Sequence, residues 1–229
     1  MRRMRRFAAT LKSPRNRTLL IGSTYDYEER IAKFLEQDTC GKTVLHHAAS
    51  RSQEHVEAIL ASLETGCPEM LDLLRAKDEN GRTVFHYATT NKDTETLVYL
   101  LKSAKCVHNR SNYEELCAML SIQDCWCKTV LHYAAGQGLD FVQIILSLFA
   151  PGSCEILELL KVQDQNGATV FHSVFESIMY QELSVYASIE DQTLESVCFD
   201  AVTLEVTRKV TETLTYMLKS AECVDNRNN

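Results

Sequence analysis

Histidine and cysteine side chains recur in this chain at places where they could ligate a metal. His46 and His47 are adjacent, and His132 follows Cys125 and Cys127 by a few residues. Zinc is bound by imidazole and thiolate ligands, but a zinc signature needs two spaced ligand pairs, and a single Cys-x-Cys supplies one. The same histidine also recurs at regular intervals, which favours a structural role. We therefore expect no metal site.

Motifs for catalysis are missing from the sequence. It contains no glycine-rich nucleotide-binding loop, no nucleophile elbow around a serine and no His-Glu zinc helix motif. We expect no catalytic residues, no cofactor and no enzymatic activity.

The recurring histidine belongs to a short motif that occurs four times. Each copy has threonine, valine, leucine or phenylalanine, and histidine in that order, and an aspartate with a turn precedes it. Repeated units of this kind bury their apolar faces only by stacking on one another, so they predict a repeat protein. The threonines and histidines are Thr43 and His46, Thr83 and His86, Thr129 and His132, and Thr169 and His172.

Each copy predicts a hairpin followed by two helices. Asn80-Gly81 and Asn166-Gly167 tolerate the positive φ angles of a tight hairpin. The threonine then occupies a helix N-cap position, and apolar residues at helical spacing follow it. Further apolar residues about ten and fourteen positions after the histidine indicate a second helix.

This order of elements, with a motif close to Thr-Pro-Leu-His-x-Ala-Ala, resembles the ankyrin-repeat family over about residues 28–227. The resemblance implies an all-α fold, an ankyrin-type helical solenoid with short hairpin-loop tips. It also implies that the four threonines cap the inner helices and that the four histidines bridge neighbouring repeats by hydrogen bonds. As for function, it implies a non-enzymatic protein–protein interaction module, acting as a scaffold or adaptor.

The repeats depart from the family pattern in two ways. Valine replaces proline after each threonine, and the threonines are separated by 40, 46 and 40 residues, against about 33 in the family. The additional residues include the amphipathic segments 68–74 and 154–160, which contain no internal helix breaker. We expect extra short helices between the repeats.

The array also contains a larger duplication and an insertion. Residues 41–90 align without a gap on residues 127–176, but residues 94–110 reappear only at 211–227, which indicates that about 31 residues were inserted. The insertion lies within about residues 173–210 and is acidic and amphipathic. It either covers the apolar face of the last repeat or docks a partner.

The predicted domain organisation has two parts. Residues 1–26 form a basic, disordered N-terminal arm, and residues 27–229 form the solenoid. The repeats start near residues 38, 78, 124 and 164.

Charge is distributed unevenly along the 229 residues. The first 25 residues contain seven basic and no acidic side chains, and the remainder contains 17 basic and 31 acidic residues, a balance of −14. The arm could be a nuclear-import signal, a contact with anionic lipid or nucleic acid, part of a transit peptide, or a solvated tail. The acidic solenoid repels phosphates, so we expect it to bind no nucleic acid and to favour a partner with a basic surface.

Composition also bears on the compartment. Nine cysteines without a hydrophobic signal segment indicate a reducing compartment, the cytoplasm, with nuclear or host-cell delivery as alternatives. No stretch approaches a membrane-spanning length. We expect a monomer.

The expected partner surface comprises the hairpin tips and the exposed face of the inner helices. Trp126 stands where the other double repeat has Asn80 at a hairpin tip, so it could anchor a partner. Alternatively, Trp126 folds onto the adjacent hairpin and the tyrosines only cover the stack. A different function would have the arginine-rich arm dock on membrane, nucleic acid or an import receptor while the repeats serve as a spacer. The expected partner-binding residues are Trp126, Tyr87, Tyr133, His47, Arg51, Asn91 and Gln137.

Overall fold

The structure is a computed structural model that describes residues 29, 31–63, 68–107, 113–176 and 195–222. All regular secondary structure within these residues is helical. The predicted all-α solenoid is therefore confirmed. The predicted N-terminal arm lies outside the described residues, and so do residues 177–194 of the predicted acidic insertion.

Each repeat consists of a hairpin and a set of short helices. The first described set is α3 (Val44–Ala49), α4 (Gln53–Ala61) and α5 (Pro68–Arg75). The second is α6 (Val84–Thr90), α7 (Thr94–Val107) and α8 (Tyr113–Leu120). The third is α9 (Val130–Gln137), α10 (Leu139–Leu146) and α11 (Cys154–Lys161). Residues 31–35 and 170–176 are helical before and after these sets, and α13 (Glu195–Glu222) follows.

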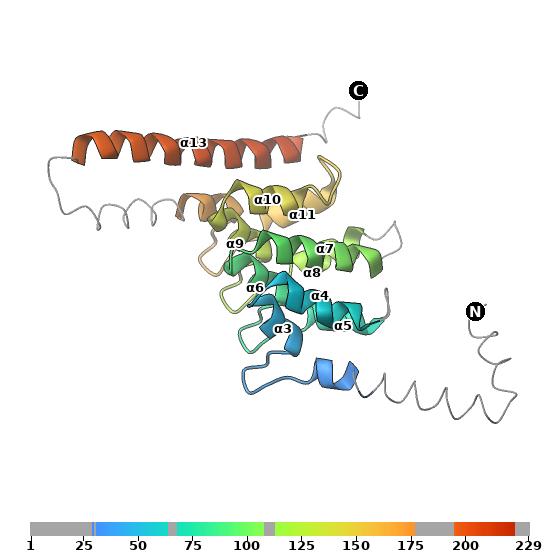
Figure 1. Cartoon of the computed structure of the whole chain (residues 1–229). Coiled ribbons are helices and arrows are strands. Elements are labelled where there is room, and N and C mark those ends of the chain that lie inside the picture. The colour runs from blue at the N-terminus through green and yellow to red at the C-terminus, as the bar shows by residue number, and fades with distance from the viewer. Residues whose placement is uncertain (1–28, 30, 64–67, 108–112, 177–194, 223–229) are drawn as a thin grey trace, which may run out of the picture.

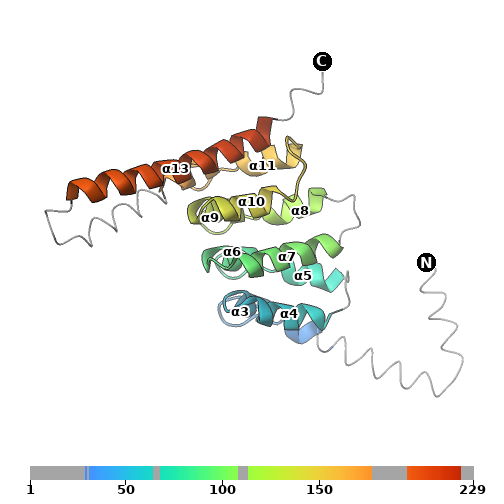
Figure 2. The ribbon, with the colours of Figure 1, turned by 45° about the horizontal axis from the view of Figure 1, so that its top comes forward.

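The helices stack in rows, and the chain rises through them in order (Figures 1 and 2). The inner helices α3, α6 and α9 contact one another in succession, and the outer helices α4, α7 and α10 form a second row. The predicted extra helices are present: α5 contacts α7, and α8 contacts α11. Hairpin loops project from the inner row, on the side opposite the C-terminal end of α7 (Figure 1).

The core runs continuously through the stack, as expected where one repeat cannot bury its own apolar face. Leu45, Phe85 and Leu131 occupy the same motif position in three repeats, and all three are fully buried. The apolar residues of the outer helices meet them from the other side, among them Val56, Leu97 and Val142. Two alanines of the motif, Ala88 and Ala134, are fully buried and let neighbouring helices approach closely.

The hairpins share one construction. In each, an aspartate Oδ1 accepts backbone N–H groups from the residues two and four positions later, as Asp78 does from Asn80 (2.9 Å) and Arg82 (2.8 Å). Gly41 and Gly81 then take positive φ angles of 73° and 75°. Backbone bonds join successive tips: Glu79 N–H to Cys40 O, Cys125 N–H to Asn80 O, and Gln165 N–H to Trp126 O, at 3.0, 2.7 and 3.0 Å.

The helix α13 lies across the last set of helices and contacts α10 and α11 (Figure 1). Val210, Thr213 and Met217 are buried on its inner side. The backbone of Gly152 also donates to the carbonyl of Ser220 at 2.7 Å. None of the described helices is both long enough and apolar enough to cross a bilayer.

Candidate functional site

The motif histidines have a defined place at the junctions between repeats. Thr43 N–H donates to His46 Nδ1 at 3.1 Å, and Thr43 Oγ1 lies 2.9 Å from the same nitrogen. The other ring nitrogen, Nε2, lies 3.1 Å from the carbonyl oxygen of Arg82 in the next repeat. Because Nδ1 accepts and a carbonyl can only accept, Nε2 must carry the proton and donate. His46 is therefore a neutral imidazole that joins two repeats.

This arrangement recurs along the stack. His86 Nε2 lies 3.3 Å from the carbonyl oxygen of Lys128, and His132 Nε2 lies 3.3 Å from that of Ala168. His172, in the fourth copy of the motif, is exposed, and its Nδ1 lies 3.0 Å from Thr169 Oγ1. The threonines precede α3, α6 and α9 with extended backbone, as N-cap residues do.

Burial keeps these imidazoles neutral. It lowers the pKa of His86 to about 4 and also lowers the pKa values of His46 and His132, although the carbonyl that each ring contacts acts in the opposite direction. An imidazole that is neutral and already makes three structural contacts has little capacity for catalysis or metal binding.

A second series of contacts runs along the hairpin side of the inner helices. Tyr87 meets the ring of His46 edge-on at 5.6 Å, lies under Lys42 Nζ at 5.0 Å, and donates its hydroxyl to Asp78 Oδ2 at 2.7 Å. One repeat later, Tyr133 makes the same contacts with His86 (5.8 Å), the Arg82 guanidinium (5.6 Å) and Asp124 Oδ2 (2.5 Å).

Burial and the bond to an aspartate raise the pKa of both tyrosines, that of Tyr133 to about 12. Sequence reasoning missed the basic and acidic partners Arg82, Asp78 and Asp124. The signal was present, because a basic residue precedes each of the first three motif threonines and the tyrosine follows the hairpin aspartate by nine positions.

Trp126 lies at a hairpin tip and is the most prominent feature of this side. Its side chain is 39% exposed, and the Arg82 guanidinium lies 4.8 Å from its ring. Arg82 is therefore placed between two aromatic rings, those of Trp126 and Tyr133, and its Nε is 3.7 Å from Asp124 Oδ2. A pocket of about 300 Å³ opens beside them, lined by Arg82, Trp126, Lys128, Tyr133, Gln165 and Asn166.

The other predicted surface residues are spread along the inner helices. His47 is exposed with Nε2 2.7 Å from Asp38 Oδ2, and Arg51 is exposed in the same repeat. Asn91 is exposed and donates to Ala49 O at 3.4 Å. Gln137 lines a second pocket, of about 230 Å³, with Tyr133. The structure thus brings Trp126 and Tyr133 to one pocket and Gln137 to its neighbour, while His47, Arg51 and Asn91 belong to the first two repeats.

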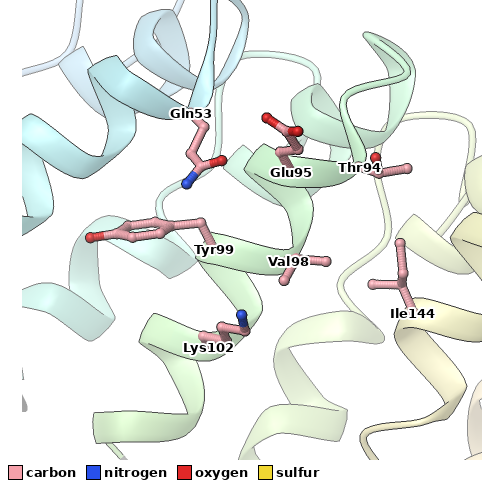
Figure 3. A pocket seen from close by; sticks show the side chains of 7 residues that line it. All are labelled: Gln53, Thr94, Glu95, Val98, Tyr99, Lys102 and Ile144. Carbon is pink, nitrogen blue, oxygen red and sulfur yellow. The ribbon is translucent and has the colours of Figure 1, made fainter.

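A different hollow lies on the outer helices (Figure 3). It has a volume of about 460 Å³ and is lined mainly by residues of α7, including Val98, Tyr99 and Lys102. Val98 lies on the side toward Ile144 of α10, and Tyr99 points the opposite way (Figure 3). Its polar side chains do not converge on a common point, so it has the character of a shallow groove between outer helices.

Ligands for a metal are not brought together in the described part of the chain. No three His, Cys, Asp or Glu side chains there lie close enough to hold an ion. Cys125 and Cys127, which the sequence places near His132, are free thiols.

Comparison with protein families agrees with this geometry. Residues 17–112 match the family of ankyrin repeats, in three copies. A comparison with curated proteins finds no match. The same hairpin, threonine cap and bridging histidine continue beyond the matched residues through His132. Ankyrin repeats are in general protein–protein interaction modules, and proteins built from them are typically non-enzymatic. The chain therefore contains ankyrin repeats.

Proposed function

We propose that this chain is a non-enzymatic scaffold or adaptor that binds another protein through its hairpin tips and the exposed face of its inner helices. The observation that supports this most directly is Trp126. Tryptophan is enriched among the few residues that carry most of the energy of an interface. Here it is 39% exposed at a tip, where water contact is unfavourable for so large an apolar side chain.

The surroundings of Trp126 favour binding because they fix its position in advance. The guanidinium of Arg82 stacks at 4.8 Å, and Arg82 is itself held by Tyr133 and Asp124. A side chain that is already ordered loses less conformational entropy when a partner covers it. The adjoining pocket of about 300 Å³ offers room for one partner side chain beside the indole.

The proposed partner has a basic surface. The acidic excess of the chain after residue 25 would attract such a protein over distances comparable with the Debye length, about 8 Å at physiological ionic strength. Association with this partner should therefore slow as salt is raised.

The experiment compares partner capture by the wild-type chain, Trp126→Ala and Tyr113→Ala. Tyr113 is a matched control, since it is 40% exposed and begins α8, on the side of the stack away from the hairpin loops (Figure 1). Trp126→Ala should weaken binding of the captured protein by about 2 kcal/mol, roughly thirtyfold, as for a central aromatic anchor. Tyr113→Ala should bind as the wild type does.

Circular dichroism and thermal unfolding accompany the binding measurement. Equal binding by Trp126→Ala and wild type would contradict the proposal, and so would a loss explained by unfolding alone. Deletion of residues 1–20 tests the alternative in which the basic arm does the docking. Under the present proposal the deleted chain still captures the partner.

A further inference from the structure

The fourth repeat lacks the tyrosine that contacts the hairpin aspartate in the second and third repeats. The hairpin aspartate in each repeat has a counterpart nine residues later: His47 for Asp38, Tyr87 for Asp78 and Tyr133 for Asp124. In those three repeats His47 Nε2 and the hydroxyls of Tyr87 and Tyr133 lie 2.7, 2.7 and 2.5 Å from the aspartate Oδ2. In the fourth repeat the counterpart of Asp164 is Ser173, which is too short to reach it.

Two buried polar atoms are left without a hydrogen-bond partner at this place. Among the described residues, neither Asp164 Oδ2 nor Ser173 Oγ has one. Both residues are more than nine-tenths buried, with exposures of 6% and 5%. A buried polar atom without a partner costs about 1–3 kcal/mol, so a donor that reached Asp164 would be favoured.

The remaining contacts for a tyrosine ring are in position. Lys128 corresponds to Lys42 and Arg82, the cations that lie over Tyr87 and Tyr133. Its Nζ is 3.9 Å from Asp164 Oδ2, as Arg82 Nε is 3.7 Å from Asp124 Oδ2. His132 corresponds to His46 and His86, the imidazoles that the two tyrosines meet edge-on.

The space that the missing ring would occupy adjoins a pocket. This pocket of about 230 Å³ is lined by Lys128, His132, Tyr133, Gly136, Gln137, Ser173 and Glu176. An engineered cavity of about 150 Å³ takes up benzene, so one phenol ring fits. Asp164 does not itself line this pocket, and its Oδ2 is buried, so an entering hydroxyl reaches it only when neighbouring side chains move. Lys128 is one of these neighbours, with Nζ 3.9 Å from Oδ2 and a side chain that is 28% exposed.

We propose that this gap is a binding site for one tyrosine side chain of the protein partner, whose hydroxyl donates to Asp164 while its ring lies against Lys128 and His132. The inference rests on the proposed function, which it sharpens by naming a side chain that the partner presents. Backbone N–H groups and Lys128 lower the pKa of Asp164 despite burial, so the carboxylate is ionised and ready to accept.

The test uses p-cresol, the side chain of tyrosine as a free molecule, with toluene as the matched control that lacks the hydroxyl. Each is titrated into the full chain while its ¹H–¹⁵N spectrum is recorded. We expect p-cresol to shift the resonances of Lys128, His132 and Ser173 in a saturable manner, with a dissociation constant of about 1–10 mM for so small a ligand. Toluene should bind about tenfold more weakly.

Two variants locate the site. Ser173→Tyr supplies the missing ring from the chain itself, so it should abolish the p-cresol shifts and raise the midpoint of thermal unfolding. Tyr87→Ser recreates the gap two junctions away, beside Lys42, His46 and Asp78, and should gain a second p-cresol site there. If either variant fails to fold, Lys128→Met provides the same test, because loss of the cation should weaken p-cresol severalfold.

Several outcomes would overturn the inference. These are no saturable shift with p-cresol, equal affinity for toluene, or p-cresol binding that arises only after Tyr180 and Tyr186 of this chain are replaced. The last would assign the site to the chain's own tyrosine. If Ser173→Tyr retains the partner while Trp126→Ala loses it, the inference is wrong and the proposed function stands. If both retain it, the proposed function itself is wrong.

Discussion

At the scale of single residues, one imidazole does two tasks in each repeat junction. His86 Nδ1 accepts from Thr83 N–H at 3.1 Å within its own repeat, and its Nε2 donates to the Lys128 carbonyl of the next. Both tasks depend on the neutral ring, because a proton on Nδ1 would remove the acceptor and leave a buried donor facing it. The residue therefore couples local helix capping to the stacking of repeats.

The substitution His86→Ala should lower the free energy of unfolding by about 1–3 kcal/mol, because it leaves a buried N–H and a buried carbonyl without partners. Urea unfolding at pH 7.5 measures the change. His172→Ala is the control: it removes the same motif residue from the fourth copy, where the ring is exposed, and should change stability little. Equal effects of the two substitutions would contradict the bridging role.

Acid should weaken the fold through the same imidazoles. Histidine has a pKa near 6.5 in the unfolded chain, and burial lowers that of His86 to about 4 in the folded one. Between these values the unfolded state binds more protons, so stability is complete above pH 6.5 and falls as the pH approaches 4. At about 1.4 kcal/mol per pKa unit, His86 contributes on the order of 3 kcal/mol to this loss.

Unfolding in urea at a series of pH values from 7.5 to 4 measures this dependence. His46 and His132 act in the same direction, since burial lowers their pKa values too. In His86→Ala the decline in stability over this range should be shallower than in the wild type. An identical decline would show that His86 does not titrate as its burial requires.

At the scale of elements, every hairpin requires a residue with positive φ, but the type of residue at that position differs between copies. Cys127 adopts a φ of 57° at the position where Gly81 has 75° and Gly167 has 75°. A residue with a Cβ in this left-handed region costs about 1–2 kcal/mol. The hairpin that bears Trp126 is therefore strained at Cys127, directly after the tryptophan. This hairpin adopts only conformations that contacts with the neighbouring hairpin tips stabilise.

Replacing Cys127 with glycine should relieve this strain and raise the free energy of unfolding by about 0.5–1 kcal/mol, after the greater freedom of glycine in the unfolded chain is counted. Gly41→Ala provides the contrast. Its Cβ would lie 2.7 Å from the backbone nitrogen of Glu79, so it should destabilise. Thermal unfolding of both variants checks the pair, and a destabilised Cys127→Gly would mean that the thiol makes contacts worth more than the strain.

At the scale of the whole molecule, the stack closes on α13. This helix lies over α10 and α11; its residue Met217 is fully buried, whereas the next residue, Leu218, is 51% exposed. In the earlier copy of the same segment, Leu100 and Leu101 are both buried, because the next repeat covers them. The contrast identifies α13 as the outermost layer of the described stack.

Substituting Met217 with alanine should therefore cost about 2–5 kcal/mol, the usual effect of emptying a buried site. Leu218→Ala should be nearly neutral, as exposed substitutions are. Hydrogen exchange reports where the loss falls: the amides of α10 and α11 should lose protection before those of α3 and α4, because each repeat is stabilised mainly by its neighbours. Uniform loss along the chain would contradict a nearest-neighbour stack.

Sequence periodicity determined the repeat architecture. The four spaced copies of threonine and histidine, the Asn-Gly turns and the apolar spacing are local signals, and each maps directly onto a cap, a hairpin or a helix face. The extra helices α5 and α11 were predictable for the same reason, because their amphipathic pattern is contained within each segment. The domain boundaries remain predictions, since residues 1–26 and much of the insertion lie outside the described structure.

The candidate site could be predicted only in part from the sequence, because its contacts join residues about forty positions apart. Trp126 and Tyr133 could be proposed from single repeats, but the stacking of Arg82 between them depends on how closely one repeat approaches the next. The gap at Ser173 likewise becomes evident only in the structure, where Asp164, Lys128 and His132 surround the position that tyrosine fills in the second and third repeats. Local sequence specifies each repeat, whereas only tertiary packing decides which side chains meet across a junction and which are left without a partner.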